Sequence, residues 1–385
     1  METLNMRSLT VEQFINEIEM DLEDNIYEPV VGIGKSGVGK TMSIYELTQK
    51  LGIGFCELRL VTLLETDLLG IPDINEHGRT TWASNDLLPL VERDGEEGIL
   101  VLDEITSATS TIRAACYQLM DSKRALGNYK LPDKWKVVAL GNGPDDGGVY
   151  SGMEAAFLNR SLSYRVEPEL GSWKKWAIAK GVNPSVVAFL TFQPEYLHKF
   201  DPDEMVSVFP SPRSWTALSE KLNRRERRTG VGKLHIGDVE TWAAGYVGEE
   251  SAPLFGAFYA YNKQVINTED IMSGKASSDV RNMETEVMHL VIQGLIKEIA
   301  EELRKGKKGG YANYEESTVK RVANAFKWTI GISKYKADYA IMIFQDVAAS
   351  VPELVEMATD DRFDKYCPEF LDYVQEVGII LQPAQ

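Results

Sequence analysis

The sequence predicts an α/β fold in which helices cover both faces of a parallel sheet, followed by a helical lid and a helical C-terminal domain. Three observations support this prediction. A strand-like run from Pro29 to Ile33 leads through a glycine-rich loop into a helix-like segment from Met42 to Leu51. Further short apolar runs alternate with helical segments as far as about residue 168, as is typical of parallel sheets. Beyond this point the periodicity is almost entirely helical.

The remaining predicted strands are short runs of apolar or alternating character. They cover residues 55–60, 99–102, 135–140 and 162–166. A capping box over residues 10–13 is expected to open a helix before the first strand. Because the strands are expected to be parallel, a ligand should bind at their carboxyl ends.

Changes in pattern predict three domains. We expect an α/β sheet domain over residues 1–168, a helical lid over 169–267 and a helical C-terminal domain over 268–385. The polar segment from Asn267 to Asn282 is interpreted as the linker between the last two.

The glycine-rich loop fits G-x-x-x-x-G-K-[ST], a motif that binds nucleotide phosphates. Its residues are Gly34, Lys35, Ser36, Gly37, Val38, Gly39, Lys40 and Thr41. Backbone N–H groups of such a loop surround phosphate oxygens, and the next helix points its positive end at the same anion. We expect Lys40 to reach the β- and γ-phosphates and Thr41 to ligate Mg²⁺. An accidental glycine-rich turn is the alternative, which the flanking strand and helix disfavour.

An acidic pair follows the apolar run from Ile99 to Leu102. Acids at the end of a buried strand are costly unless they bind something. Asp103 is predicted to hold the water shell of Mg²⁺, and Glu104 to polarise the attacking water as general base. The alternative is a solvated acidic turn, which the phosphate-binding motif upstream disfavours.

The glycine-rich loop and the run from Leu100 to Glu104 together resemble an AAA+ ATPase. Val138 to Asn142 resembles the sensor-1 strand of that family, and Ala156 to Arg160 resembles the run that carries its arginine finger. Ser211 to Trp215 resembles the sensor-2 run that opens a lid helix. The resemblance implies ATP and Mg²⁺ as cofactors.

The same resemblance implies roles for three further polar residues. Asn142 would touch the γ-phosphate and the lytic water, Arg160 would act as the arginine finger, and Arg213 would sense nucleotide from the lid. Here Ser161 follows the finger arginine, where the family usually has Phe, and Arg165 lies near enough to compete for the role. A turn residue at position 142 and ordinary surface arginines are the alternatives.

Two expected hairpins point to one branch of the family. Residues 70–83 resemble a helix-2 insert, and residues 125–132 have the size of the hairpin that precedes sensor 1. Residues 246–252 resemble the lid of MoxR-type ATPases that accompany von Willebrand A-domain proteins. The resemblance covers residues 1 to about 267. It implies a homo-oligomeric ring, most simply a hexamer, that acts on a protein client, with a von Willebrand A-domain protein as a candidate.

Composition helps to choose between function classes. The 385 residues carry a formal net charge of -17, from 58 acidic and 41 basic side chains, which argues against broad nucleic-acid contact. A nucleic-acid-linked motor stays the alternative, supported by the basic run from Asn223 to Arg228. A scaffold that holds nucleotide without turnover is disfavoured by Lys40, Asp103 and Glu104. With no basic leader and no apolar span of membrane length, we expect a cytoplasmic protein.

Overall fold

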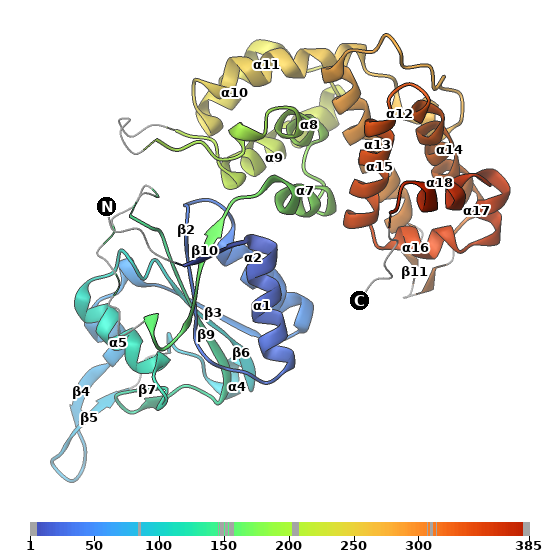
Figure 1. Cartoon of the computed structure of the whole chain (residues 1–385). Helices are drawn as coiled ribbons and strands as arrows, with labels where there is room; N and C mark the ends of the chain where they lie inside the picture. Colours follow the sequence, from blue (N-terminus) through green and yellow to red (C-terminus); the bar gives the residue numbers. More distant parts are fainter. Residues whose placement is uncertain are drawn as a thin grey trace. The chain divides into compact units, whose positions relative to one another are not determined.

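The chain folds into two compact units. The computed structural model describes residues 6–83, 86–144, 146, 150, 153, 158–201, 208–305, 307–308, 311–312 and 314–379. The sheet unit comprises Met1–Glu169 with Phe200–Val206, and the helical unit comprises Leu170–Lys199 with Ser207–Gln385 (Figure 1).

The sheet unit is built on six parallel strands in the order β1-β10-β2-β9-β6-β3. Their bounds are Arg7–Thr10 (β1), Val30–Gly34 (β2), Gly54–Arg59 (β3), Glu97–Asp103 (β6), Lys134–Gly141 (β9) and Leu162–Glu167 (β10). The predicted parallel sheet is confirmed, and its five predicted strands are all present. The sixth strand, β1, lies at the edge, where its sequence of four residues has too little apolar character to reveal it.

Helices cover both faces of this sheet, as predicted. Helices α1 (Val11–Glu23) and α2 (Lys40–Leu51) lie on one face and α5 (Ser110–Met120) on the other (Figure 1). Successive residues of β6 alternate between two apolar cores, with Ile99 and Val101 in one and Leu100 and Leu102 in the other. A strand buried on both faces needs such a continuous apolar run.

A buried lysine ties α1 to the sheet. The side chain of Lys136, in β9, has no exposed surface, and its ammonium group lies 2.8 Å from the Asp21 carboxylate. The same group donates hydrogen bonds to the carbonyl oxygens of Ile26 and Glu28 at 3.1 and 2.8 Å. Burial lowers the pKa of Lys136, and Asp21 acts in the opposite direction. These contacts hold the end of α1 and the chain that enters β2.

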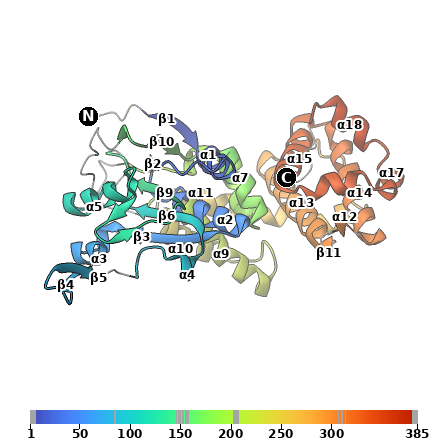
Figure 2. The same ribbon diagram turned by 90° about the horizontal axis from the view of Figure 1, so that it is seen from below.

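Two hairpins interrupt the alternation of strands and helices. One pairs β4 (Ile71–Ile74) with β5 (Thr80–Ala83) and projects from the sheet unit (Figures 1 and 2). The other pairs β7 (Ala125–Leu126) with β8 (Tyr129–Lys130). Asn128, at the tip of the second hairpin, donates hydrogen bonds to Thr81 Oγ1 and the Trp82 carbonyl at 2.9 and 3.3 Å. The two hairpins are therefore connected. Short helices α3 (Glu65–Leu69) and α4 (Val91–Asp94) flank the projecting hairpin in sequence.

The helical unit packs around one apolar core. Its α-helices are Leu170–Ala179 (α7), Pro184–Phe192 (α8), Pro212–Thr229 (α9), Ile236–Val247 (α10), Ser251–Ala260 (α11), Thr268–Met272 (α12), Thr285–Lys305 (α13), Glu316–Ser333 (α14), Ala337–Ser350 (α15), Glu353–Ala358 (α16), Asp361–Tyr366 (α17) and Phe370–Glu376 (α18). Short 3-10 turns cover Leu60–Thr62, Pro194–Tyr196 and Tyr261–Gln264, and Lys307–Lys308 (β11) pairs with Tyr311–Ala312 (β12). None of the described helices combines the length and apolar character needed to cross a membrane.

The core of the helical unit runs from Trp173 to Val374. Interpreting residues 267–282 as a linker is wrong for their first part, because α12 lies there and buries Ile271 and Met272 in this core. The division into a lid and a C-terminal domain near residue 267 stays a prediction.

Candidate functional site

The phosphate-binding motif forms the loop between β2 and α2. Gly37 and Gly39 have φ of 77° and 102°, in the left-handed region that favours glycine. Gly34 is required for a different reason, since a Cβ there would lie 1.9 Å from the carbonyl oxygen of Val166 in β10. The backbone conformation and packing of this fold therefore require these glycines, in addition to any requirement of phosphate binding.

Positive charge collects in this loop. Among the described residues, no side chain caps the start of α2, where Gly39 is the N-cap, so the positive end of the helix faces the loop. Lys40 is only 8% exposed. Its ammonium group donates hydrogen bonds to the carbonyl oxygens of Gly34 and Lys35 at 2.6 and 2.9 Å. A lysine charge and a helix end in one small loop make a site for a polyanion.

A hydrogen bond joins the loop to the end of β6. The Thr41 hydroxyl donates to Asp103 Oδ2 at 3.2 Å, and the Glu104 backbone N–H donates to Asp103 Oδ1 at 3.0 Å. Hydroxyl and carboxylate oxygens are the ligands that Mg²⁺ prefers. No group of three or more acidic, histidine or cysteine residues in the described parts of the chain could hold a metal by itself. Thr41 and Asp103 therefore fit a Mg²⁺ ion whose other ligands are water and substrate phosphates.

Glu104 stands where the chain leaves the sheet. Its φ is 60°, a left-handed conformation that is uncommon outside glycine. The following residue returns to the sheet, because the Ile105 N–H donates to the Leu140 carbonyl of β9 at 2.9 Å. Asn142 directly follows β9, the neighbour of β6 in the sheet. Asp103, Glu104 and Asn142 thus all lie at the carboxyl edge that also carries the phosphate-binding loop.

Two further residues at this end of the strands, Thr106 and Asp146, were not predicted from the sequence. The Asn142 N–H donates to Thr106 Oγ1 at 3.1 Å. The Gly143 N–H donates to Asp146 Oδ2 at 2.7 Å, and Arg165 Nη2 lies 3.3 Å from Asp146 Oδ1. Arg165 also pairs with Glu167. No local pattern marks Thr106 or Asp146, because Thr106 meets Asn142, 36 residues later, and Asp146 meets Arg165 of β10.

Arg160 lies at the opposite, amino-terminal end of the strands of the same sheet. It precedes the first residue of β10, Leu162, which pairs with Val30 at the start of β2. The phosphate-binding loop follows Gly34, four strand positions further along, or about 13 Å away. Arg160 and the loop are therefore at opposite ends of the strands of one sheet unit.

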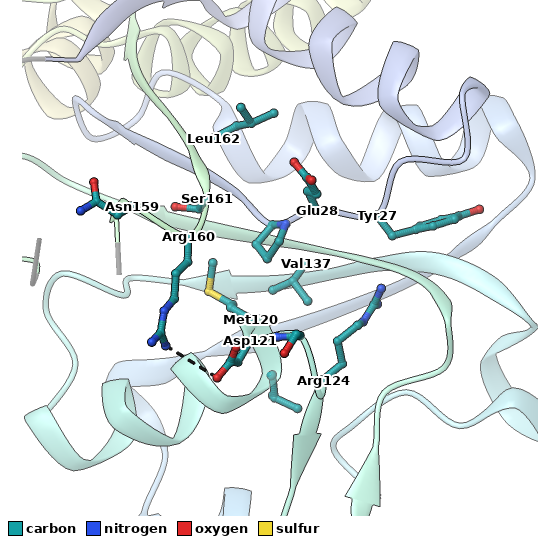
Figure 3. A pocket seen from close by; sticks show the side chains of 13 residues that line it. Tyr27, Glu28, Met120, Asp121, Arg124, Val137, Asn159, Arg160, Ser161 and Leu162 are labelled. Carbon is teal, nitrogen blue, oxygen red and sulfur yellow. Dashed lines mark hydrogen bonds and ion pairs between the residues drawn. The ribbon is translucent and has the colours of Figure 1, made fainter. Parts of the chain in front are cut away.

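A cavity of about 610 Å³ opens beside Arg160 (Figure 3). Its walls come from the segment before β2, the end of α5, β9 and the segment before β10, and include Glu28, Asp121 and Arg124. The Arg160 side chain is 59% exposed, and Nη1 lies 3.7 Å from Asp121 Oδ2. Ala156 and Phe157, the start of the expected finger run, lie outside the described residues.

Arg213 belongs to the helical unit. It lies in the first turn of α9, where the Ser211 hydroxyl accepts the Ser214 N–H at 3.2 Å. Pro212 occupies the first helical position. The sensing role of Arg213 stays a prediction.

Comparison with known families gives one match. Residues 29–161 match the model of the AAA domain, dynein-related subfamily. This region starts just before β2 and ends just before β10, so it contains the phosphate-binding loop, Asp103, Glu104, Asn142 and Arg160. Together with the sheet topology, the match identifies an AAA+ P-loop domain, which implies nucleotide binding. Among curated protein sequences, none matches the chain.

Solved structures give weaker likenesses. A proposed ATPase from Cytophaga hutchinsonii ATCC 33406 is 12% identical, with a TM-score of 0.32, over 98% of this chain and 92% of its own. The Holliday junction branch migration motor RuvB of Thermotoga maritima is 12% identical, with a TM-score of 0.31, over 77% of this chain and 76% of its own. Scores this low support no conclusion about this chain.

Proposed function

We propose that this chain is a Mg²⁺-dependent ATPase motor of the MoxR type, which works as a homo-oligomeric ring and uses ATP hydrolysis to remodel or activate a protein client. The observation that carries the proposal is the hydrogen bond between Thr41 and Asp103. It brings the phosphate-binding loop and the end of β6 together as one site, with the Lys40 charge inside the loop.

Each residue at the carboxyl edge has a role in this proposal. Lys40 and the N–H groups of the loop bind the β- and γ-phosphates. Thr41 and Asp103 would hold Mg²⁺, which would supply positive charge to neutralise the phosphates. Glu104 accepts a proton from the attacking water. Asn142 orients this water beside the γ-phosphate, as the family resemblance implies.

The position of Arg160 supports a ring. Because it lies about 13 Å of strand away from the loop of its own sheet, it would act on nucleotide bound by a neighbouring copy. An arginine there stabilises the charge of the transition state. Arg165 is the weaker candidate, since its guanidinium is engaged by Asp146 and Glu167. In a closed ring, most simply a hexamer, every copy receives an arginine from its neighbour.

The projecting hairpin supports a protein client. Ile71, Ile74 and Trp82 are exposed large apolar side chains on this hairpin, and exposed apolar surface is typical of protein contacts. The net charge of -17 also favours a protein over a nucleic-acid backbone. A von Willebrand A-domain protein is a candidate client by resemblance alone.

The test is a Glu104→Gln variant, with Glu96→Gln as a matched control because Glu96 is an exposed carboxylate of the same unit. We expect Glu104→Gln to bind ATP and to form rings but to lose turnover by about 100-fold or more. The control should hydrolyse ATP at the normal rate. Tagged Glu104→Gln rings with ATP should then capture the client. Undiminished turnover in Glu104→Gln would exclude Glu104 as the base, and failure of the unaltered protein to bind ATP would overturn the proposal.

One observation favours a second candidate, a nucleic-acid-linked motor. The end of α9 exposes Arg224, Arg225, Arg227 and Arg228, and the Arg225 guanidinium lies 5.4 Å from the centre of the Trp242 ring. Cations beside an aromatic ring suit single-stranded nucleic acid. Stimulation of the ATPase by DNA or RNA, declining steeply with salt, would favour this candidate.

A further inference from the structure

The carboxyl ends of β6 and β9 are fastened to each other beyond the last ladder hydrogen bonds. The ladder pairs Leu102 with Ala139 as its last register pair. After the left-handed turn at Glu104, the Ile105 N–H donates to Leu140 O at 2.9 Å. The Asn142 N–H then donates to Thr106 Oγ1 at 3.1 Å. The two residues that follow Glu104 are thus each bonded to β9 or to the segment after it that carries Asn142.

The Thr106 side chain is enclosed at this junction. It has no exposed surface. A Cβ at Gly141 would lie 2.7 Å from both Thr106 Cγ2 and Oγ1, so the threonine packs directly against the backbone of β9. The Asn142 N–H is partly buried, and an N–H that is shielded from water and loses its acceptor is expensive to leave unpaired. The hydroxyl of Thr106 therefore holds the backbone of Asn142 in one place.

We infer that Thr106 is a positioning residue, which sets the Asn142 side chain relative to Glu104 and so aligns the water for attack. This inference rests on the proposed function, in which Glu104 and Asn142 both act on that water. Misplacement of a catalytic group by about 1 Å can cost roughly 100-fold in rate. Loss of the hydroxyl should thus slow hydrolysis with little change in nucleotide affinity, because the Thr106 hydroxyl bonds to the backbone of Asn142 and not to the phosphate-binding loop.

Two matched substitutions separate the hydroxyl from the bulk of the side chain. Thr106→Val keeps the shape and removes the acceptor, whereas Thr106→Ser keeps the acceptor and removes a methyl group. We expect Thr106→Val to lower kcat about ten-fold or more with KM little changed. Thr106→Ser should retain kcat within a few-fold. Equal activity of the two variants, whether both normal or both impaired, would overturn the inference.

A double-mutant cycle with Asn142→Ala identifies the route of the effect. Alanine at position 142 keeps the backbone N–H that Thr106 accepts but removes the side chain that meets the water. Adding Thr106→Val to Asn142→Ala should therefore change kcat by no more than about two-fold, because coupled residues are not additive. A full, additive loss would show that Thr106 acts elsewhere, and would overturn the inference.

An activity-independent measurement distinguishes this inference from the proposed function. Amide hydrogen exchange at Asn142 should be faster in Thr106→Val than in Thr106→Ser, without any nucleotide present. Unchanged exchange would overturn the positioning role even if the protein is an active ATPase. Conversely, faster exchange in a protein that never hydrolyses ATP would leave the bond real and the proposed function wrong. Should the valine variant fail to fold, Thr106→Ala replaces it in each comparison with serine.

Discussion

Arg165 Nη2 lies 3.3 Å from the carboxylate of Asp146, and the side chain of Asp146 is only 1% exposed. This carboxylate also accepts the N–H of Gly143, next to Asn142. Arg165 therefore neutralises a buried acid that fastens the chain after β9. A guanidinium with this structural duty is poorly suited to reach another copy of the protein. This contact favours Arg160 over Arg165 as the arginine finger, and substitution of Arg160 tests that choice.

Arg160→Ala should lower the ATPase rate of assembled rings by about 1,000-fold, since it would remove transition-state charge stabilisation. ATP binding should be retained, because Arg160 is remote from the loop of its own sheet unit. Steady-state turnover and equilibrium ATP binding measure the two quantities. Mixing Arg160→Ala with Lys40→Ala copies should restore part of the activity, as each copy supplies what the other lacks. Full turnover by Arg160→Ala alone, at any dilution, would contradict a trans-acting arginine at this position.

Asn128→Ala should loosen the projecting hairpin without affecting hydrolysis. Its side chain provides the two hydrogen bonds to Thr81 and Trp82, and it lies on the hairpin β7–β8, away from the loop before α2. Limited trypsin digestion should cut faster after Arg79 in the variant, while turnover stays normal. Lys130→Ala, on the same hairpin, is the control and should not change cleavage at Arg79. Equal cleavage rates in Asn128→Ala and the unaltered protein would show that the tether is not needed to order the hairpin.

Lys136→Met should reduce the free energy of unfolding of the sheet unit by about 3 kcal/mol, since removing one partner of a buried ion pair leaves the other uncompensated. The Asp21 carboxylate and two backbone carbonyls would lose their donor. Urea titration measures the change. Lys50→Met is the matched control, because Lys50 pairs with Glu19 across a surface where its own side chain is 61% exposed. A loss of unfolding free energy no greater in Lys136→Met than in the control would show that the buried contacts of Lys136 do not stabilise the sheet unit.

His289→Phe should make the helical unit less sensitive to acid. Burial, together with the nearby charge of Lys174, lowers the pKa of His289 to about 4, and its ring packs against Phe192 and Tyr339. The folded state thus binds the proton less readily than the unfolded state, whose pKa is about 6.5. The contribution of His289 to stability is fully present above pH 6.5 and is lost as the pH falls toward 4, by about 2 kcal/mol at pH 5.

The measurement is the difference in unfolding free energy between His289→Phe and the unaltered protein at pH 7.5 and at pH 5. The difference should shift in favour of the variant at pH 5. Carboxylates elsewhere titrate equally in both proteins, so they cancel. A pH-independent difference would show that His289 is not held neutral by its surroundings.

Sequence alone determined the elements whose signal is local. The phosphate-binding loop is a contiguous motif with fixed glycine positions, and Asp103 and Glu104 directly follow a strand that is apolar because both its faces are buried. Continuous apolar strands alternating with helices also sufficed to predict the parallel sheet. The loop and the acidic pair can each be recognised in one short stretch of sequence, and the alternation needs only the order of such stretches along the chain.

Only the tertiary structure decided which distant residues share a site. Thr106 meets Asn142 because β6 and β9 are neighbours in register, and Asp146 meets Arg165, which lies in another strand, β10. Strand order and register are set by the packing of the whole sheet, so no window of sequence contains them. The same reason explains why the polar sequence around α12 suggested a linker although Ile271 and Met272 are buried by helices far along the chain.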